Sequence, residues 1–284
     1  MAAATRRNWA FLGRRLLTGA ILASCAVVAV EAGGVVFLAV VTALAVIVTF
    51  EWIKMSCRGQ SRATLIVSIV TALASAIMFA IWDGEKALIA GVVGTVLVGL
   101  VARFEKNNPI LVAAGVAIFA LSLISTYWLR IENGTGLVTV YLLFVVVWAT
   151  DSGAYLIGSF LGGARIAPRI SPGKTWAGAA GGFVFGILFG IALTILLVSV
   201  GMLAEMPNLV TIAAASALFS LFAQFGDLAE SSVKRLFGVK DSGSLLPGHG
   251  GALDRLDSLI FVAPLLALAV FLAGGSGRLL WAGG

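Results

Sequence analysis

Long apolar segments alternate with short polar ones along almost the whole chain. Nine of them approach the roughly 20 residues that a helix needs to cross the hydrocarbon core of a bilayer. They are predicted at 15–30, 34–54, 63–82, 86–103, 109–130, 137–163, 175–201, 208–233 and 257–277. Helices are expected because a lipid-exposed open sheet would leave backbone groups without hydrogen bonds. The pattern predicts an all-α polytopic membrane protein of about nine transmembrane helices.

Basic residues are concentrated in alternate connections between these segments. Of the 19 Lys and Arg residues, 16 fall on the side of the N-terminus, and only Lys86, Arg130 and Arg278 fall on the other. Cytoplasmic loops of membrane proteins carry an excess of Lys and Arg. The distribution supports the predicted spans and predicts a cytoplasmic N-terminus and a C-terminus outside.

The composition excludes an ordinary soluble protein. Charged residues make up 11% of the chain, whereas a soluble domain carries roughly 25%. The longest stretch without an apolar run, Lys234 to Asp257, is too short to form a separate core. We expect residues 1–284 to form a single integral membrane domain, with the polar motifs in 137–260. The net charge of +6 is spread through loops and forms no basic stripe, which argues against a nucleic-acid partner.

The N-terminus is similar to a secretion signal. Four Arg residues precede an apolar run to Val30, and Leu22-Ala23-Ser24-Cys25 resembles a bacterial lipoprotein cleavage box. Further predicted spans follow directly, and basic flanks are common around the first helix of a polytopic protein. An uncleaved first span is favoured, with processing as the alternative.

Glycine recurs every four residues in the seventh predicted span, at Gly178, Gly182, Gly186 and Gly190. Such a strip allows another helix to approach closely. Packing against a helix of the same chain is the favoured interpretation. A homodimer seam is the alternative.

Three acids within the spans are candidates for function, because charges in the membrane are costly. They are Asp151 in the sixth span and Asp227 and Glu230 in the eighth. Asp227, Glu230 and Lys234 fall on one face of a helix. The group could be a buried ion-pair ladder or part of an active site.

The loop 237–257 contains five glycines, which permit the close backbone approach that phosphate-binding loops require. Asp254 and Asp257 stand three residues apart at the start of the ninth span. Helix capping is the simpler explanation for these acids, but it accounts well for only one of them.

A second polar loop, 165–175, leads into the seventh span on the same side. Gly173-Lys174-Thr175 is similar to the end of a P-loop, but Pro168 occupies the required first glycine position and a membrane helix precedes it. The P-loop interpretation fails. A Lys and free N–H groups at a helix N-terminus nevertheless attract phosphate.

His249 is the only histidine of the chain. Without a second His or a thiolate cluster a zinc site is not expected. Hard carboxylates beside a phosphate-binding surface instead favour Mg²⁺.

The polar segments resemble the signature of one family, the phosphatidate cytidylyltransferases, also called CDP-diacylglycerol synthases. The matching segments are Ser231-Ser232-Val233-Lys234-Arg235, Lys240-Asp241-Ser242-Gly243, Pro247-Gly248-His249-Gly250-Gly251 and Asp254-Arg255-Leu256-Asp257, with Asp151-Ser152-Gly153-Ala154-Tyr155 and Ser171-Pro172-Gly173-Lys174-Thr175-Trp176 upstream. The resemblance covers roughly 145–260, and the first five spans resemble the family only in hydropathy. Ala252 departs from the pattern, which usually has a larger aliphatic residue; this concerns packing rather than chemistry.

The resemblance implies transfer of a cytidylyl group from CTP to phosphatidic acid, giving CDP-diacylglycerol and pyrophosphate. Two polyanions would meet at the membrane surface, so cations must offset their repulsion. A phosphate monoester has its second pKa near ~6 and can attack without a general base. His249 would then orient a substrate or stabilise charge.

These features give a hypothesis for the site. Mg²⁺ would bind to Asp227 and Asp254, with Asp151 or Asp257 available to a second cation. Lys174, Lys234, Arg235, Lys240 and Arg255 would bind CTP and the lipid phosphate, beside Ser171 and Thr175. The expected location is a bacterial inner membrane, with the site facing the cytoplasm.

Two other functions are weighed. A cation-coupled transporter could use Asp151, Asp227 and Glu230 along a path, but it would place charges toward both faces. Another CTP-using enzyme, such as a polyprenol kinase, would differ mainly in its acceptor. A CDP-alcohol phosphotransferase is disfavoured because its repeated Asp pattern is absent.

Overall fold

The computed structural model describes residues 19–57, 59, 61–132, 134–243, 245, 250–272 and 278–281. Within these residues, eight helices are long and apolar enough to cross a membrane. They are α2 Gly34–Ser56, α3 Arg62–Ile81, α4 Gly84–Phe104, α5 Pro109–Ile131, α6 Gly136–Leu161, α7 Trp176–Ser199, α8 Leu209–Leu236 and α9 Leu253–Leu272. The predicted all-α polytopic fold is confirmed, while the orientation of the termini stays a prediction.

The first predicted span corresponds to a shorter apolar helix, Gly19–Ala32. Residues 15–18 of that prediction lie outside the described residues. Two boundaries at the site also differ from the prediction: α8 continues three residues further, to Leu236, and α9 begins at Leu253 rather than at residue 257. As a result Asp254 and Asp257 both lie in the first turns of α9.

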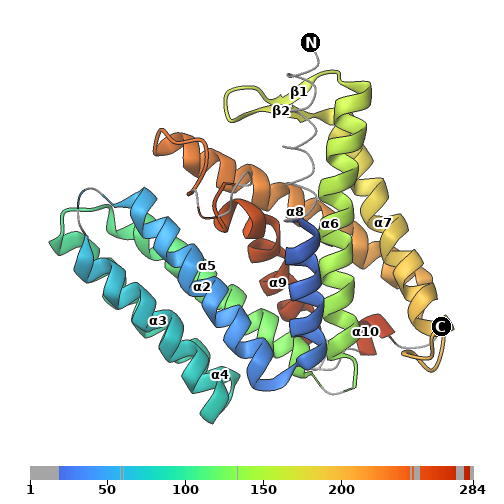
Figure 1. Ribbon diagram of the computed structural model, residues 1–284, viewed down its shortest axis with the longest axis horizontal. Helices are drawn as coiled ribbons and strands as arrows, with labels where there is room; N and C mark the ends of the chain where they lie inside the picture. Colours follow the sequence, from blue (N-terminus) through green and yellow to red (C-terminus); the bar gives the residue numbers. More distant parts are fainter. Residues whose placement is uncertain are drawn as a thin grey trace.

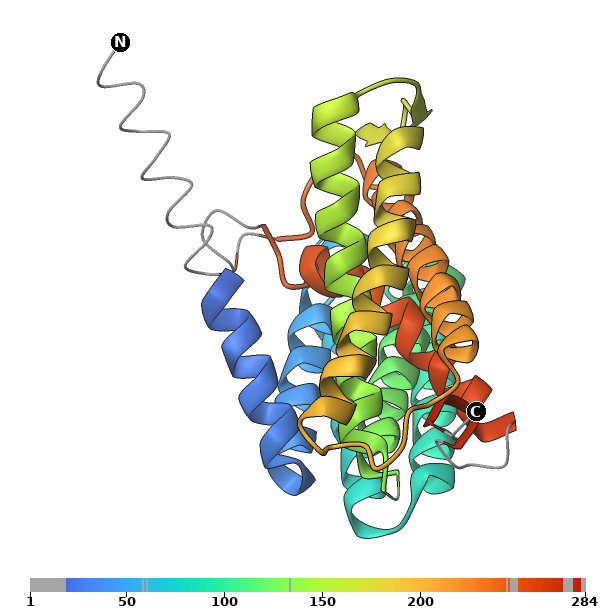
Figure 2. The same ribbon diagram turned by 90° about the vertical axis from the view of Figure 1, so that its right-hand side faces the viewer.

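Consecutive long helices run in opposite directions, so alternate connections meet at the same end of the bundle (Figure 1). The C-terminal ends of α2, α4, α6 and α8 and the N-terminal ends of α3, α5, α7 and α9 share one end, which we call the motif end. α5 and α9 are central: α5 packs on α2, α4 and α9, and α9 packs on α8 and α6 as well. α3 and α4 lie on one side and α6 and α7 on the other (Figures 1 and 2).

Several helices begin at a residue that caps free backbone amides. Asn108 Oδ1 accepts a hydrogen bond from Leu111 N, and Pro109 occupies the first position of α5, where its missing N–H costs nothing. Asn208 and Asp83 cap α8 and α4 in the same way. These polar residues therefore fix where the apolar segments begin as helices.

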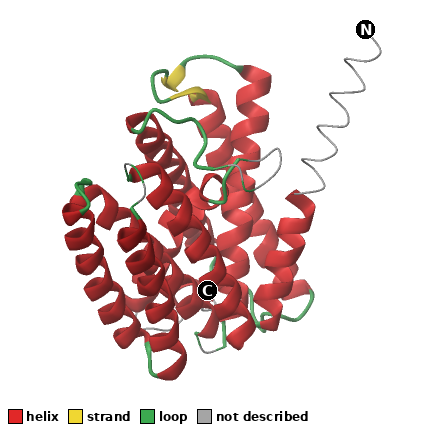
Figure 3. Ribbon diagram, turned by 60° about the vertical axis from the view of Figure 1, so that its left-hand side comes forward, coloured by secondary structure: helices red, strands yellow, loops and turns green. Residues whose placement is uncertain are grey.

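A two-stranded antiparallel hairpin stands at the motif end between α6 and α7, and the sequence did not predict it. Its strands are β1 Arg165–Ala167 and β2 Ser171–Thr175, with Arg165 opposite Thr175 and Ala167 opposite Ser171. Figure 3 shows it as the strand pair above the helices. At the opposite end the short helix α10, Arg278–Trp281, is fixed by a 2.8 Å hydrogen bond from Trp281 Nε1 to Thr139 Oγ1.

The glycine strip of α7 is buried within the chain. A Cβ at Gly182 would lie 2.6 Å from the carbonyl oxygen of Thr150 in α6, and a Cβ at Gly190 would lie 2.1 Å from Ser216 Oγ in α8. All four glycines of the strip are buried. The strip is therefore occupied by α6 and α8 and is not available as a homodimer seam, which corrects that alternative.

Candidate active site

One ion pair joins the hairpin to α8. Lys174, on β2, places its Nζ 2.8 Å from Asp227 Oδ2. The side chain of Lys174 is 25% exposed and that of Asp227 34%, so both side chains are partly accessible to solvent. Two residues predicted from separate segments are thus brought into direct contact.

A second set of charges joins α8 to α9. Lys234 Nζ lies 2.5 Å from Glu230 Oε2 and 2.6 Å from Asp254 Oδ1. All three side chains are at most 11% exposed. Glu230 and Lys234 are one turn apart on α8, as their spacing predicted. The set is an ion-pair ladder, and its third member comes from the next helix.

Asp254 also organises the loop before α9. Its carboxylate accepts hydrogen bonds from Ser242 N, at 3.0 Å to Oδ2, and from Gly251 N at 2.8 Å. Gly250 has φ +78°, and a Cβ there would lie 2.7 Å from Asp254 Oδ2. Because the loop wraps so closely around this carboxylate, glycine is required at this position.

Arg235 anchors the hairpin to the end of α8. Its Nε donates to the carbonyl oxygen of Ile170, and its Nη1 donates to that of Val239, both at 3.0 Å. The side chain is exposed, with donors beyond these two bonds. Arg235 therefore holds two motif segments together while remaining accessible to an anion.

Three acids form a third group at the motif end. Asp151, Asp227 and Asp257 lie near enough for their charges to interact, and Lys174 and Arg255 lie near Asp151 in the same way. Asp257 is 9% exposed and Asp151 is exposed. Asp257 Oδ1 accepts a hydrogen bond from Ser258 N at 2.8 Å. α6, α8 and α9 thus bring acids from three distant segments into one electrostatic neighbourhood.

The remaining predicted site residues are not members of these ion pairs. Thr175 caps α7, with its Oγ1 accepting a 3.0 Å hydrogen bond from Gly178 N. Ser171 lies on β2 and is partly buried, and Lys240 is exposed beyond α8. His249 lies outside the described residues, so its role stays a prediction.

The sequence interpretation missed Glu51. This residue lies in α2, is 4% exposed, and accepts hydrogen bonds from Ser242 Oγ, Ala252 N and Leu253 N. Its charge within an apolar segment was a usable signal by the same argument that singled out Asp151. The contact could not be foreseen because α2 and α9 are far apart in sequence.

Carboxylate oxygens are the type of ligand that the predicted Mg²⁺ would need. Mg²⁺ prefers oxygen ligands and commonly takes one or two carboxylates, with waters and substrate phosphates completing its shell. Three mutually repelling carboxylates leave negative charge for a cation to neutralise. Within the described part of the chain no three His, Cys, Asp or Glu side chains are grouped so that they could hold a metal ion by themselves, and the magnesium site stays a prediction.

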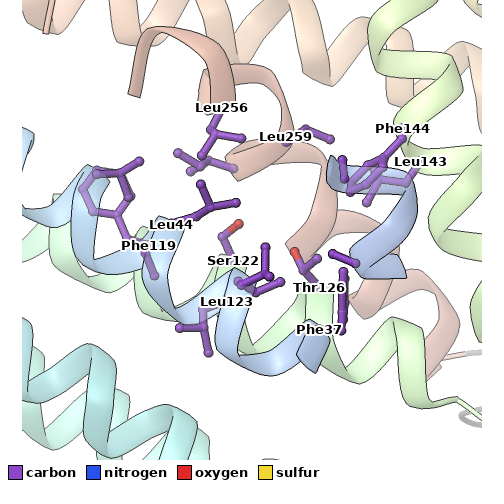
Figure 4. Close-up of a pocket in the computed structure, with 17 residues that line it drawn as sticks. Phe37, Leu44, Phe119, Ser122, Leu123, Thr126, Leu143, Phe144, Leu256 and Leu259 are labelled. Atoms are coloured by element: carbon purple, nitrogen blue, oxygen red, sulfur yellow. The ribbon is translucent and has the colours of Figure 1, made fainter. Parts of the chain in front are cut away.

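An apolar cavity of about 100 Å³ lies between the helix Gly19–Ala32, α2, α5, α6 and α9 (Figure 4). Among its lining residues only Ser122 and Thr126 have polar side chains. Leu256 and Leu259 of α9 border it, so it adjoins the acids at the start of that helix. The lining contains no charged side chain, whereas the ion pairs lie at the motif end.

Comparisons with known proteins agree with this geometry. The sequence profile of the cytidylyltransferase family matches residues 13–273. A phosphatidate cytidylyltransferase of Brucella suis biovar 1 is 36% identical over 259 residues, which cover 90% of this chain and 92% of the relative. That of Bacillus subtilis is 39% identical over 182 residues, 62% of this chain and 64% of the relative. The similarity extends well beyond the 145–260 on which the resemblance was based.

Proposed function

The chain belongs to the cytidylyltransferase family, and from that premise we propose that it transfers the cytidylyl group of CTP to phosphatidic acid, giving CDP-diacylglycerol and pyrophosphate. The observation that carries the proposal is the cluster of ion pairs at one end of an otherwise apolar helical bundle. A water-soluble nucleotide and a membrane lipid can meet only at such a surface.

The basic residues of the cluster bind the two anionic substrates. Lys174, Lys234, Arg235, Lys240 and Arg255 offset the repulsion between the triphosphate and the lipid phosphate. The side chains of Lys174 and Asp227 are partly exposed, and we expect a phosphate oxygen to replace the carboxylate as the partner of Lys174 when substrate binds. Binding of substrate would thereby release an oxygen of Asp227.

The acids would hold Mg²⁺, with Asp227 and Asp254 as the first candidates and Asp151 or Asp257 for a second cation. A bound cation supplies Lewis-acid polarisation of a phosphoryl oxygen. Asp227 is the readier ligand because its side chain is 34% exposed and it pairs with the partly exposed Lys174. Asp254 already accepts from Lys234 and two loop amides, so it holds the loop in addition to any ligand role.

The lipid phosphate is the nucleophile. Its second pKa lies near ~6, so it is largely dianionic at neutral pH and needs no general base. The protein contributes by holding it in line with the α-phosphate of CTP and by stabilising the charge that develops there. His249 is assigned to orientation or charge stabilisation on the resemblance alone.

The motif end faces the cytoplasm of a bacterial inner membrane, where CTP is available. The strong excess of Lys and Arg at this end supports the orientation, and bacterial relatives support the location. A cation-coupled transporter is less consistent with this arrangement, because the opposite side carries only Lys86, Arg130 and Arg278 as basic residues in sequence.

The test is release of pyrophosphate by the purified protein in detergent with CTP and phosphatidic acid, with and without Mg²⁺. Release that requires all three supports the proposal. Release with CTP and a polyprenol, but not with phosphatidic acid, would assign another acceptor. Absence of release with either lipid, in protein shown to be folded, would favour the transporter.

A further inference from the structure

We propose that Glu51 is a positioning residue of the active site: from α2, outside the motifs, it fixes the start of α9 and the Ser242 segment, so that Asp254 is held in place. The expected loss of turnover rests on the proposed function, whereas the expected displacement of α9 and the Ser242 segment does not.

The contacts of Glu51 span two segments of the site. Oε1 accepts from Ala252 N at 3.0 Å, and Oε2 accepts from Leu253 N at 2.8 Å and from Ser242 Oγ at 3.2 Å. Ser242 and Leu253 lie 191 and 202 residues away in sequence. One carboxylate thus ties the loop after α8 to the N-terminus of α9.

The same two segments hold Asp254. Ser242 donates its backbone N–H to Asp254 and its hydroxyl to Glu51. Leu253, whose N–H binds Glu51, directly precedes Asp254. A displacement of the Glu51 carboxylate would therefore move the backbone at Leu253, next to Asp254, and would also move Ser242, which donates a hydrogen bond to Asp254.

Apolar packing makes the position of Glu51 rigid. The adjacent Trp52 donates from Nε1 to Val112 O at 3.1 Å, and its ring meets Phe237, at the end of α8, edge to face. Trp52, Ala252 and Leu253 belong to one buried cluster. The end of α2 is thus packed against both helices that carry the ion-pair ladder.

Backbone amides and a hydroxyl, rather than a cationic side chain of the described residues, bind the carboxylate of Glu51. None of the ion pairs found among the described residues includes Glu51. Its negative charge instead faces the N-terminus of α9, where free N–H groups and the helix dipole stabilise an anion. Neither substrate reaches it, because the residue is only 4% exposed.

The experiment compares Glu51→Gln with Glu105→Gln. Glu105 is a matched control, since it also accepts two backbone amides and a hydroxyl at a helix start, from Ala63 and Thr64 of α3. Gln cannot accept at both side-chain atoms, so each variant loses part of one cap. Turnover per folded protein and hydrogen exchange of the segment 241–256 are measured in both.

Glu51→Gln should lower kcat roughly 10- to 100-fold, because small misplacements of reacting groups cost up to about 10²-fold. KM for CTP should change less than kcat, since Glu51 touches neither substrate. Exchange in 241–256 should be faster than in the wild type. Glu105→Gln should leave both readouts within about twofold of the wild-type values.

Equal kcat values in the two variants, or unchanged exchange in 241–256 in Glu51→Gln, would overturn the proposal. If Glu51→Gln does not insert, Ser242→Ala tests the same link by removing only the hydroxyl, and it should lower kcat about three- to tenfold. A kcat of Ser242→Ala equal to that of the wild type would then contradict the positioning role of Glu51. If the wild-type protein itself releases no pyrophosphate, the proposed function fails, while the exchange comparison still decides the position of α9.

Discussion

The N-termini of α3 and α9 lie at the same end of the bundle and are both capped by a carboxylate, but of the two, within the described residues, α9 alone carries an ion-pair cluster. Glu105, which follows α4, accepts hydrogen bonds from Ala63 N at 3.2 Å and from Thr64 Oγ1 at 2.6 Å. Glu51 accepts comparable bonds at α9. At each of the two N-termini, a carboxylate from elsewhere in the chain therefore accepts hydrogen bonds from the first backbone amides of the helix.

The difference lies in what each helix places in its first turns. α3 begins Arg62-Ala63-Thr64-Leu65, without an acid, whereas α9 places Asp254 and Asp257 there. Lys234 faces Asp254 from the neighbouring α8. The carboxylate cap holds the first turn of either helix in place. Whether that turn can take part in the reaction depends on the charged side chains it carries.

The largest expected effect comes from removing the acid that distinguishes α9. Asp254→Asn should lower turnover about 1,000-fold or more, because the site loses a proposed Mg²⁺ ligand and Lys234 keeps only Glu230 as its ion-pair partner. Pyrophosphate release per folded protein measures it. Asp83→Asn, at an exposed helix cap at the opposite end, is the control and should remain close to wild type, because Asn caps as well as Asp. Turnover of Asp254→Asn within tenfold of wild type would show that this acid is dispensable.

Removing the charge of Lys174, the hairpin residue that pairs with Asp227, tests whether the ion pairs at the motif end are needed for turnover. Lys174→Gln should lower turnover about 100-fold, the usual cost of one electrostatic donor at a reacting phosphate or carbonyl. The comparison variant is Lys86→Gln, whose exposed pair with Asp83 is worth at most about 1 kcal/mol. Similar kinetics in the two variants would remove Lys174 from the substrate site.

A single methyl group can disturb the α9 cap without changing any charge. A Cβ at Gly251 would lie 2.2 Å from Ser242 Oγ and 2.5 Å from Glu51 Oε2, so Gly251→Ala should lower turnover roughly 10- to 100-fold by moving the loop. Gly99→Ala, in α4, would meet Ala113 Cβ at an ordinary 3.5 Å, and its activity should be unchanged. A fully active Gly251→Ala variant would argue that the loop tolerates displacement.

The smallest effect is expected at α3. Glu105→Gln should lower stability by about 1 kcal/mol, the typical cost of a lost cap, with little change in activity. Burial tends to raise the pKa of Glu105, but the hydrogen bonds from Thr64 and Ala63 outweigh it and hold this pKa below 4.5. The stability due to its charge is therefore complete above pH 4.5 and is lost as the pH falls through the lowered pKa. Thermal unfolding of both proteins from pH 7 to pH 3.5 should show the difference shrink, and a constant difference would contradict this origin.

Much of the site could be predicted because its residues sit in short polar segments of an apolar chain. The positions of Lys174, Asp227 and Asp254 relative to the spans placed all three at one end of the bundle, and the structure brings them into ion pairs there. The spacing of Glu230 and Lys234 likewise predicted their contact. The partner of Lys174 could not be predicted, since it depends on how the hairpin folds over α8.

The N-terminal half shows where such reasoning stops. Glu51 stood in an apolar span without neighbouring motif residues, and its partners at Ser242 and Leu253 come from the other end of the chain. In the C-terminal half, the hairpin was also missed, because Pro172 and Gly173 within β2 are unfavourable in strands.

The sequence by itself determined the spans, the concentration of basic residues on one side and the family signature. These follow from hydropathy and local spacing, because insertion into a bilayer depends on the length of each apolar segment and on the basic residues beside it. Only the tertiary structure decided that α6 and α8 cover the glycine strip of α7, that Lys234 bridges Glu230 and Asp254, and that Glu51 holds the start of α9. The physical reason is that these contacts join segments far apart in sequence, and only the packing of the helices brings them within hydrogen-bonding distance.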